Sequence, residues 1–405
     1  MNLKLSHISS IENKTLQITG SKSETNRLLI LQALYPSIKI ENVSNSDDSE
    51  LMQKALLSNE LIVDIHHAGT AMRFLTAYFA VKDGRETVLT GSKRMQERPI
   101  KILVDALRQL GCKISYEKQE GYPPIRIQGT KPIANQVELQ ANVSSQYISA
   151  LMLIAGSLPN GLVITLKGKV TSVPYINMTL SLLKDVGVKG TFEDNVITIQ
   201  PNNTNLNKNV VVESDWSSAS YFYSIIALSD NAEVTIGSYK QESYQGDSSL
   251  ADIYKHLGVK TTFGQNSITL TKSNVATKFP EELNLSNSPD IAQTIVVTCF
   301  GLGIGCYLTG LHTLKIKETD RLEALKAEIE KLGGQVTITQ DSLRLEPMTL
   351  LNKDISIATY NDHRMAMAFA PLALRTDLFI EDANVVSKSY PDFWSDLKKL
   401  GFKVS

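Results

Sequence analysis

One structural unit is repeated about six times along the chain, and this repeat restricts the possible folds more than any other feature of the sequence. An amphipathic helix pattern that ends in an apolar residue and a glycine occurs five times, each time before an alternation typical of β-strands. The five glycines lie 68 to 76 positions apart: Gly111, Gly187, Gly258, Gly333 and Gly401. Each unit is therefore predicted to contain an amphipathic helix followed by two strands.

A second pattern occurs in the same units. It is a mostly apolar helix with a polar or charged start, and its five copies lie 72 to 74 positions apart, starting at Thr70, Ser144, Ser217, Asp290 and Asp362. A sixth, shorter copy opens at Ser21, where Ser21 and Glu24 are expected to form a capping box. Each unit is thus predicted to run as buried helix, strand, amphipathic helix and two strands.

The N-terminus is expected to complete the last unit. The chain stops at Ser405 with one strand of that unit missing, while residues 1–20 hold two spare strand-like runs. We therefore expect an α/β (α+β) fold of two lobes with three units each, residues 21–212 and residues 213–405 with 1–20. The two crossings, near 20–21 and 213–215, are expected to act as a hinge.

Composition excludes some classes of function. The formal charge is −1, which gives no overall field for nucleic acid or an anionic membrane, so any anion site must be local. Three scattered cysteines and an N-terminus without signal-like character lead us to expect reduced thiols in a cytoplasmic protein. The uncharged run 291–311 is long enough to span a bilayer, but its polar residues and glycines favour a buried helix, a turn and a strand.

Lys317, Glu318 and Arg321 crowd the start of one predicted helix, which runs from Asp320 to Leu332 with Thr319 or Asp320 as its cap. A cation in a first helical turn costs about 0.3 to 1 kcal/mol unless an anion lies beside it. This placement indicates a bound anion, with a surface ion pair to Glu318 as the alternative.

Cations also stand near the starts of other apolar helices: Lys22, Arg73 and Arg364. If the units are equivalent, their helices are parallel and their positive N-terminal ends converge. The expected ligand therefore carries more than one anionic group, as a phosphate or carboxylate compound would.

Asp290 and Glu318 are the acid and base candidates among these cations. Nearby cations lower the pKa of a carboxylate and favour a role as base or orienting group. The plain alternative for Asp290 is a helix cap. The hydroxyls of Ser217 and Ser218 are interpreted as structural, because serines at helix starts are most often caps.

Eleven short motifs follow one another along the chain: GSKSETNR at 20–27, AGTAMR at 68–73, RMQERPI at 94–100, SSQ at 144–146, SVPYI at 172–176, SSASYF at 217–222, QGD at 245–247, PDIA at 289–292, KETDRL at 317–322, YNDHRMAM at 360–367 and SYPDFW at 389–394. In this order they resemble the 5-enolpyruvylshikimate-3-phosphate (EPSP) synthase family over nearly the whole chain.

The resemblance implies a two-lobed inside-out α/β barrel with three βαβαββ units in each lobe. It implies transfer of the enolpyruvyl group of phosphoenolpyruvate to the 5-hydroxyl of shikimate 3-phosphate, through a tetrahedral adduct that loses phosphate. It further implies that the enzyme uses no cofactor or metal and is a target of glyphosate. From the balanced net charge we expect no nucleic acid or membrane partner. We expect a monomer.

The same resemblance assigns roles to individual residues. Shikimate 3-phosphate would be bound by Lys22, Ser23, Arg27, Ser144, Ser145, Ser172 and Lys317. Phosphoenolpyruvate would be bound by Lys22, Gly69, Arg98, Gln146, Arg321, Arg364 and Lys388. Asp290 would take the hydroxyl proton, and Glu318, together with Lys22, would protonate the methylene carbon.

The chain departs from the family pattern at several positions. His67 and Thr313 stand where the family usually has Asn. Phe74 stands where the family often has Pro directly after the arginine that corresponds to Arg73. The Thr313 change puts a contact with shikimate 3-phosphate in doubt. Trp216 and Tyr244 replace smaller or more flexible residues and are interpreted as packing residues.

Two other functions remain open at this point. A UDP-N-acetylglucosamine enolpyruvyl transferase has the same repeats, but usually carries a reactive cysteine in the loop where this chain has RMQERPI. A non-catalytic two-lobed anion-binding protein would not require Asp290 and Glu318 among its cations.

Overall fold

The computed structural model describes residues 1–141, 144–168, 170, 173–202, 204, 206–273 and 278–405. It divides into two compact units, here called the N-terminal lobe (residues 20–212) and the C-terminal lobe (residues 1–19 with 213–405). The expected division was at 20–21 and 213–215. The hinge at these crossings stays a prediction.

The N-terminal lobe contains helices and short strands in alternation. Its helices are α1 (Lys22–Leu34), α2 (Asp47–Leu57), α3 (Gly69–Val81), α4 (Lys93–Gln96), α5 (Lys101–Gln109), α6 (Ser145–Ala155) and α7 (Val173–Val186). Its strands are β3 (Lys39–Glu41), β4 (Ile62–Asp64), β5 (Glu86–Thr90), β6 (Lys113–Tyr116), β7 (Ile125–Gln128), β8 (Gln136–Gln140), β9 (Leu162–Lys167), β10 (Gly190–Glu193), β11 (Val196–Ile199) and β12 (Asn209–Val211).

The C-terminal lobe has a similar alternation with several 3-10 segments. Its α-helices are α8 (Trp216–Leu228), α9 (Leu250–Ile253), α10 (Ala292–Gly301), α11 (Arg321–Lys331), α12 (His363–Phe369) and α13 (Phe393–Lys399). Its 3-10 segments are η1 (Gly246–Ser249), η2 (Tyr254–Leu257), η3 (Pro289–Ile291), η4 (His312–Ile316), η5 (Ala370–Leu374) and η6 (Ala383–Lys388). Its strands are β1 (Leu3–Ser6), β2 (Lys14–Gln17), β13 (Glu233–Gly237), β14 (Val259–Phe263), β15 (Ser267–Lys272), β16 (Leu283–Asn284), β17 (Cys306–Thr309), β18 (Val336–Ile338), β19 (Leu343–Leu345), β20 (Ile355–Ile357), β21 (Leu378–Ile380) and β22 (Lys403–Val404).

Five four-stranded sheets share one topology, in which a parallel pair is extended by two antiparallel neighbours. Their orders are β4-β5-β7-β6, β8-β9-β11-β10, β2-β13-β15-β14, β16-β17-β19-β18 and β20-β21-β1-β22. The sixth sheet is the parallel pair β3 and β12. This common topology confirms that the chain is built from copies of one unit.

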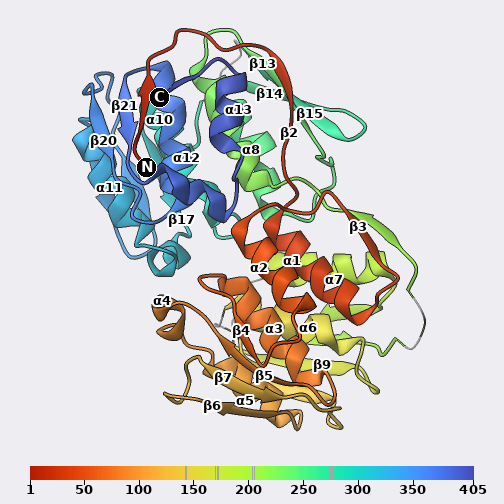
Figure 1. Cartoon of the computed structure of the whole chain (residues 1–405). Coiled ribbons are helices and arrows are strands. Elements are labelled where there is room, and N and C mark those ends of the chain that lie inside the picture. The colour runs from red at the N-terminus through yellow and green to blue at the C-terminus, as the bar shows by residue number, and fades with distance from the viewer. Residues whose placement is uncertain (142–143, 169, 171–172, 203, 205, 274–277) are drawn as a thin grey trace. The chain divides into compact units, whose positions relative to one another are not determined.

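The two N-terminal strands belong to the C-terminal lobe. Strand β1 lies between β21 and β22, with Leu3 opposite Ile380 and Leu5 opposite Val404 (Figure 1). Strand β2 pairs in parallel with β13. The N-terminal segment therefore supplies the central strand that the last sheet needs.

The repeated glycines have a common conformational role. All five stand after their helices with φ between +76° and +100°, a region that side chains with a Cβ rarely adopt: Gly111, Gly187, Gly258, Gly333 and Gly401. The glycine that marks each unit in the sequence is thus the residue that ends a helix and turns the chain into the next strand.

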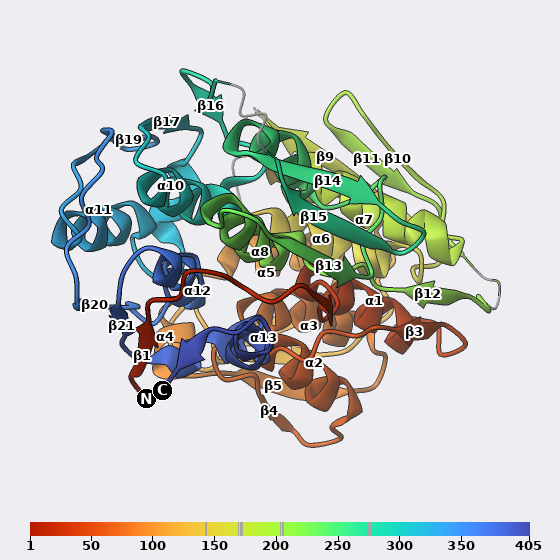
Figure 2. The same ribbon diagram turned by 90° about the horizontal axis from the view of Figure 1, so that it is seen from above.

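The apolar helices form the core of each lobe. Every residue of α8 and of α10 is buried, and α10 contacts both α8 and α12 (Figure 2). In the N-terminal lobe α3 and α6 pack against each other and against α1. Strands such as β8 alternate exposed and buried residues, so one sheet face covers these helices. A helix that is apolar all round is expected to be buried in this way.

Two sequence predictions about this core are confirmed and one is wrong. The uncharged run forms α10, a turn and β17, and no helix in the described part of the chain is long and apolar enough to cross a membrane. Cys112, Cys299 and Cys306 are buried free thiols. The capping box at α1 does not form, because the Ser21 hydroxyl makes no cap hydrogen bond.

Candidate active site

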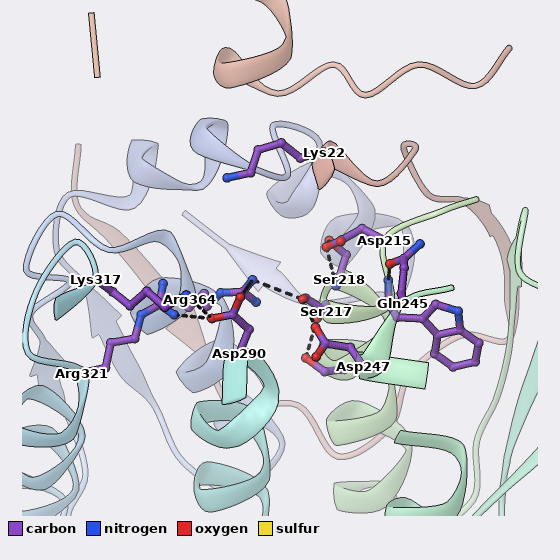
Figure 3. Close-up of polar contacts among 12 residues, drawn as sticks. Lys22, Asp215, Ser217, Ser218, Gln245, Asp247, Asp290, Lys317, Arg321 and Arg364 are labelled. Atoms are coloured by element: carbon purple, nitrogen blue, oxygen red, sulfur yellow. Dashed lines mark hydrogen bonds and ion pairs between the residues drawn. The ribbon is translucent and has the colours of Figure 1, made fainter. Parts of the chain in front are cut away.

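Asp290 lies in η3 and faces three cations from separate parts of the C-terminal lobe (Figure 3). Its Oδ1 accepts a hydrogen bond from Nη1 of Arg321 at 2.8 Å and lies 3.4 Å from Nζ of Lys317. Its Oδ2 lies 3.4 Å from Nη2 of Arg364. The helix-cap alternative is wrong, because Ile291 occupies the cap position of α10 and no side chain caps it.

The cations determine the charge of Asp290. Burial alone would raise the pKa of this carboxyl group, but Lys317, Arg364 and Arg321 together hold the pKa well below its usual value. Asp290 is therefore ionised at neutral pH.

Arg321 connects three carboxylates. Its Nε donates to Asp362 at 2.6 Å, its Nη1 to Asp290, and its Nη2 to Glu318 at 2.9 Å. Only 2% of its side chain is exposed. Burial would lower the pKa of Arg321, but Asp362, Glu318 and Asp290 raise it above its ordinary value.

These contacts change the interpretation of the α11 start. The helix begins at Arg321, and Asp320 caps it by accepting from the backbone N–H groups of Leu322 and Glu323. Three carboxylates of the protein offset Arg321, where the sequence had suggested a bound anion or a surface ion pair with Glu318. The pair with Glu318 exists, but the arginine in it is buried.

Arg364 is the second residue of α12, which Asp362 caps by accepting from the Arg364 backbone N–H at 2.9 Å. Its Nε is buried without a hydrogen-bond partner among the described residues. Nearby, Nζ of Lys388 donates to the backbone carbonyl of Asn361 at 2.6 Å. One donor of Arg364 therefore has no acceptor among the described residues.

The two serines at the start of α8 differ in role. Asp215 caps this helix and accepts from both the backbone N–H and the hydroxyl of Ser218. The structural interpretation of Ser218 is therefore confirmed. Ser217 is not the cap of α8; its hydroxyl donates to Asp247 and accepts from Nη2 of Arg364 at 3.2 Å.

Lys22 opens α1 in the N-terminal lobe, and its Nζ lies 3.9 Å from Oδ2 of Asp48. That ion pair is long, and the side chain of Lys22 is 27% exposed. Lys22 is therefore a cation that an anionic ligand could reach.

Arg27 is fully engaged by the N-terminal lobe itself. Its guanidinium donates to the hydroxyls of Thr179 and Ser149 at 2.8 and 2.9 Å and to the carbonyl of Ser23 at 2.8 Å. Burial lowers the pKa of Arg27 to about 10. The residue therefore joins α1, α6 and α7, and the contact with substrate that the sequence predicts stays a prediction.

Gly69 lies directly beside Arg98. A Cβ at position 69 would come within 2.7 Å of Nη1 of Arg98. Arg73, from the next turn of α3, donates to the Gly69 carbonyl at 3.0 Å. Burial and the charge of Arg98 lower the pKa of Arg73 to about 10. The missing side chain at Gly69 thus makes room for Arg98.

The start of α6 carries three of the predicted ligands. Ser144 caps this helix and accepts from the backbone N–H of Gln146, and Ser145 is its first residue. Nε2 of Gln146 donates to the hydroxyl of Thr70 at 3.1 Å. Gln146 therefore connects α6 to the start of α3. The remaining predicted ligand, Ser172, lies outside the described residues.

The departures from the family pattern are largely packed into the protein. Phe74 is buried, with its ring centre 5.4 Å from the Arg27 guanidinium carbon. Nε2 of His67 lies 3.8 Å from Oδ2 of Asp47. The hydroxyl of Thr313 is buried without a partner among the described residues, and Trp216 is fully buried, which confirms its packing role.

Sequence reasoning did not assign roles to Asp362 and Asp247. Both stand in motifs that were visible, YNDHRMAM and QGD. Their roles depend on partners 41 and 30 positions away, Arg321 and Ser217, which local spacing does not indicate.

The C-terminal lobe thus combines an ionised carboxylate with cations that can bind anions. Asp290 and Glu318 both contact Arg321, so one guanidinium holds two possible proton-transfer groups. Among the described residues, no group of three or more His, Cys, Asp or Glu side chains could hold a metal ion. A reaction without a metal stays a prediction.

A family model described as EPSP synthase (3-phosphoshikimate 1-carboxyvinyltransferase) matches residues 53–397. A 3-phosphoshikimate 1-carboxyvinyltransferase from Bacteroides fragilis is 46% identical over 399 residues, which cover 96% of each chain. Another from Haemophilus influenzae is 35% identical over 435 residues, which cover 99% of each chain.

Solved structures show the same fold. An EPSP synthase from Acinetobacter baumannii matches with a TM-score of 0.81 at 19% identity, covering 100% of this chain and 99% of that one. An enolpyruvyl transferase from Streptomyces tendae matches with a TM-score of 0.75 at 14% identity, covering 100% and 98%. These likenesses confirm the mixed helix and strand architecture of two lobes.

Proposed function

The chain belongs to the EPSP synthase (3-phosphoshikimate 1-carboxyvinyltransferase) family, and from this premise we propose which of its residues bind each substrate and which transfer protons. The enzyme transfers the enolpyruvyl group of phosphoenolpyruvate to the 5-hydroxyl of shikimate 3-phosphate and releases phosphate. This reaction belongs to the shikimate pathway of aromatic biosynthesis.

Binding is assigned to the cations and hydroxyls at the helix starts. Lys22, Gly69, Arg98, Gln146, Arg321, Arg364 and Lys388 bind phosphoenolpyruvate in this proposal. Shikimate 3-phosphate is bound by Lys22, Ser23, Arg27, Ser144, Ser145, Ser172 and Lys317. The buried cations suit these ligands because both substrates carry phosphate and carboxylate groups, which pair strongly with guanidinium and ammonium.

Proton transfer is assigned to the two carboxylates. Asp290 accepts the proton of the 5-hydroxyl while the hydroxyl oxygen bonds to the central carbon of phosphoenolpyruvate. Glu318, with Lys22, donates a proton to the methylene carbon. The tetrahedral adduct then breaks its bond to the phosphate oxygen and returns a proton from the methyl carbon.

The observation that carries this proposal is the shared environment of Asp290, 2.8 to 3.4 Å from three cations. A carboxylate held at a low pKa is a weak base. When substrate phosphate and carboxylate groups bind Lys317 and Arg364, they weaken this stabilisation and raise the pKa of Asp290 toward that of a useful base.

Release of phosphate from phosphoenolpyruvate is the test. We expect release with shikimate 3-phosphate as acceptor and none with UDP-N-acetylglucosamine. Release with the second acceptor alone would favour the sister enzyme, and binding without release would favour a non-catalytic anion-binding protein. We also expect a monomer in the cytoplasm, and light scattering of the purified enzyme tests the first of these.

A further inference from the structure

A buried side-chain amide, that of Gln245, fixes the QGD motif (residues 245–247) against the start of α8. The side chain of Gln245 accepts from the backbone N–H of Trp216 at 2.9 Å and donates to the carbonyl of Ser214 at 3.1 Å. Only 5% of Gln245 is exposed. Because these bonds go to the main chain, Asp247, two residues later, is held in a fixed position beside this helix.

Ser217 connects Asp247 to Arg364 (Figure 3). A guanidinium can only donate hydrogen bonds, so the Ser217 oxygen accepts from Nη2 of Arg364 at 3.2 Å and its single hydrogen goes to Asp247. The same Nη2 lies 3.4 Å from Oδ2 of Asp290. One nitrogen of Arg364 is thus shared between Ser217 and Asp290.

Ser217 is not needed to build the helix. Asp215 already caps α8, and the Ser217 side chain is 5% exposed. Among the described residues, Asp247 forms no direct ion pair, so the Ser217 hydroxyl is its link to a cation. A buried serine with two charged partners and no capping task indicates a role at Arg364.

We propose that Asp247 and Ser217 are positioning residues that turn the Arg364 guanidinium toward phosphoenolpyruvate. Asp247 orients the hydroxyl of Ser217, and this hydroxyl holds Nη2 away from full pairing with Asp290. The inference rests on the proposed function, because it assumes that Arg364 binds phosphoenolpyruvate.

The charge of Asp247 gives the arrangement a pH dependence. The groups that face it are Asp290 from η3, Arg364 from α12 and Asp215 at the start of α8. Burial raises the pKa of Asp247 to about 7, and the Asp290 carboxylate adds to the rise. As the pH passes 7, Asp247 gains a negative charge beside Arg364, which opposes binding of an anion there.

The test measures KM for both substrates and kcat in the full-length enzyme. We expect Ser217→Ala to raise KM for phosphoenolpyruvate about tenfold or more, the size of a lost hydrogen bond to a charged group. Ser217→Thr keeps the hydroxyl and should restore KM to within about threefold of wild type. Ser218→Ala is the matched control in the same helical turn and should leave KM unchanged.

Asp247→Asn supplies a second readout that packing alone would not change. Asn still accepts from Ser217 but carries no charge, so its KM for phosphoenolpyruvate should match wild type at pH 6 and fall below wild type at pH 8. If Ser217→Ala does not fold, this pH profile decides. An unchanged KM in Ser217→Ala, an equal rise for both substrates, or a wild-type pH profile in Asp247→Asn would overturn the proposal.

Arg364→Ala separates the inference from the proposed function. If Arg364→Ala leaves KM for phosphoenolpyruvate unchanged, the binding role of Arg364 is wrong, and the positioning role falls with it. If Arg364→Ala raises KM while Ser217→Ala does not, only the positioning role is wrong.

Discussion

Nη1 of Arg321 lies 2.8 Å from Oδ1 of Asp290, which joins the first turn of α11 to the segment that precedes α10. Nε of the same guanidinium donates to Asp362, the cap of α12. Two neighbouring repeat units therefore meet at one buried side chain. The helix starts of these units are held together by charge as well as by the apolar core behind them.

Asp290→Asn should lower kcat while the protein remains folded. The amide fits the same space but cannot accept a proton as a base, and a general acid or base contributes roughly a hundredfold to ten-thousandfold to rate. The measurements are kcat from phosphate release and the dissociation constant of shikimate 3-phosphate, which should change little. A variant with nearly normal kcat would leave Asp290 as a charge partner of Arg321 and Glu318 as the base.

Glu318→Gln tests the second carboxylate. Glu318 contacts Arg321 through Nη2 at 2.9 Å, and 36% of its side chain is exposed, so the loss of one partly exposed charge should cost little stability. We expect kcat to fall by about a hundredfold or more and the thermal midpoint to stay near that of wild type. Solvent deuterium incorporation into recovered phosphoenolpyruvate should slow in parallel, because Glu318 is assigned protonation of the methylene carbon.

Replacing Arg98 or Arg364 by Ala should weaken the use of phosphoenolpyruvate. Removing one partner of a desolvated charge pair costs roughly 2 to 5 kcal/mol, so kcat/KM should fall by about tenfold to several thousandfold. Arg126→Ala is the control, because Arg126 pairs with Glu117 on an exposed strand surface, where an ion pair contributes little. A similar loss in all three variants would indicate damage to the fold.

Arg321→Ala is expected to behave differently from these two. Its removal would leave Asp362, which is fully buried, without its arginine partner, and breaking a buried pair costs about 3 to 5 kcal/mol. A large drop in the denaturant midpoint should therefore accompany the loss of activity. Arg98→Ala, measured in the same way, should lose activity with a much smaller drop.

The repeat architecture was predictable because its signals are local. A glycine with positive φ follows a helix in each of five units, and apolar helices are recognised from their own residues. The partners of Arg321 were not predictable, since Asp290 and Asp362 are 31 and 41 positions away. The same limit applies to Ser217. Its position at a helix start is typical of a cap, whereas its hydroxyl donates a hydrogen bond to Asp247 and accepts one from Arg364.

Asp247→Asn should also change how stability depends on pH. The pKa of Asp247 is about 7 in the folded protein and about 3.9 in an unfolded chain, so between these values the unfolded state loses a proton that the native state keeps. The stability that this group contributes is present below pH 3.9 and is lost as the pH rises to 7. The thermal midpoint of the variant should therefore exceed that of wild type at pH 8 and match it near pH 4.

Equal midpoint differences at both values of pH would contradict the raised pKa. Asp252→Asn is a suitable control, because the Asp252 side chain is 82% exposed and, among the described residues, forms an ion pair only with the surface residue Lys255. Its midpoint difference from wild type should not depend on pH in this way.

Gly69→Ala should displace Arg98 without unfolding α3. The new methyl group would lie 2.7 Å from Nη1 of Arg98, closer than real contacts allow, and the flexible end of an arginine can move away more readily than a helix backbone. Alanine also favours the helix by roughly 1 kcal/mol relative to glycine. We therefore expect a higher KM for phosphoenolpyruvate, little change in KM for shikimate 3-phosphate, and unchanged or increased stability.

A double-mutant cycle identifies the cause of that change. If Gly69→Ala acts by moving the Arg98 guanidinium, it should have little further effect on kcat/KM in the Arg98→Ala background, because the effects of substitutions at two residues in contact do not add. Additive losses would mean that the methyl group blocks the substrate directly. In that case Gly69 would shape the pocket itself, and the position of Arg98 would be set by other contacts.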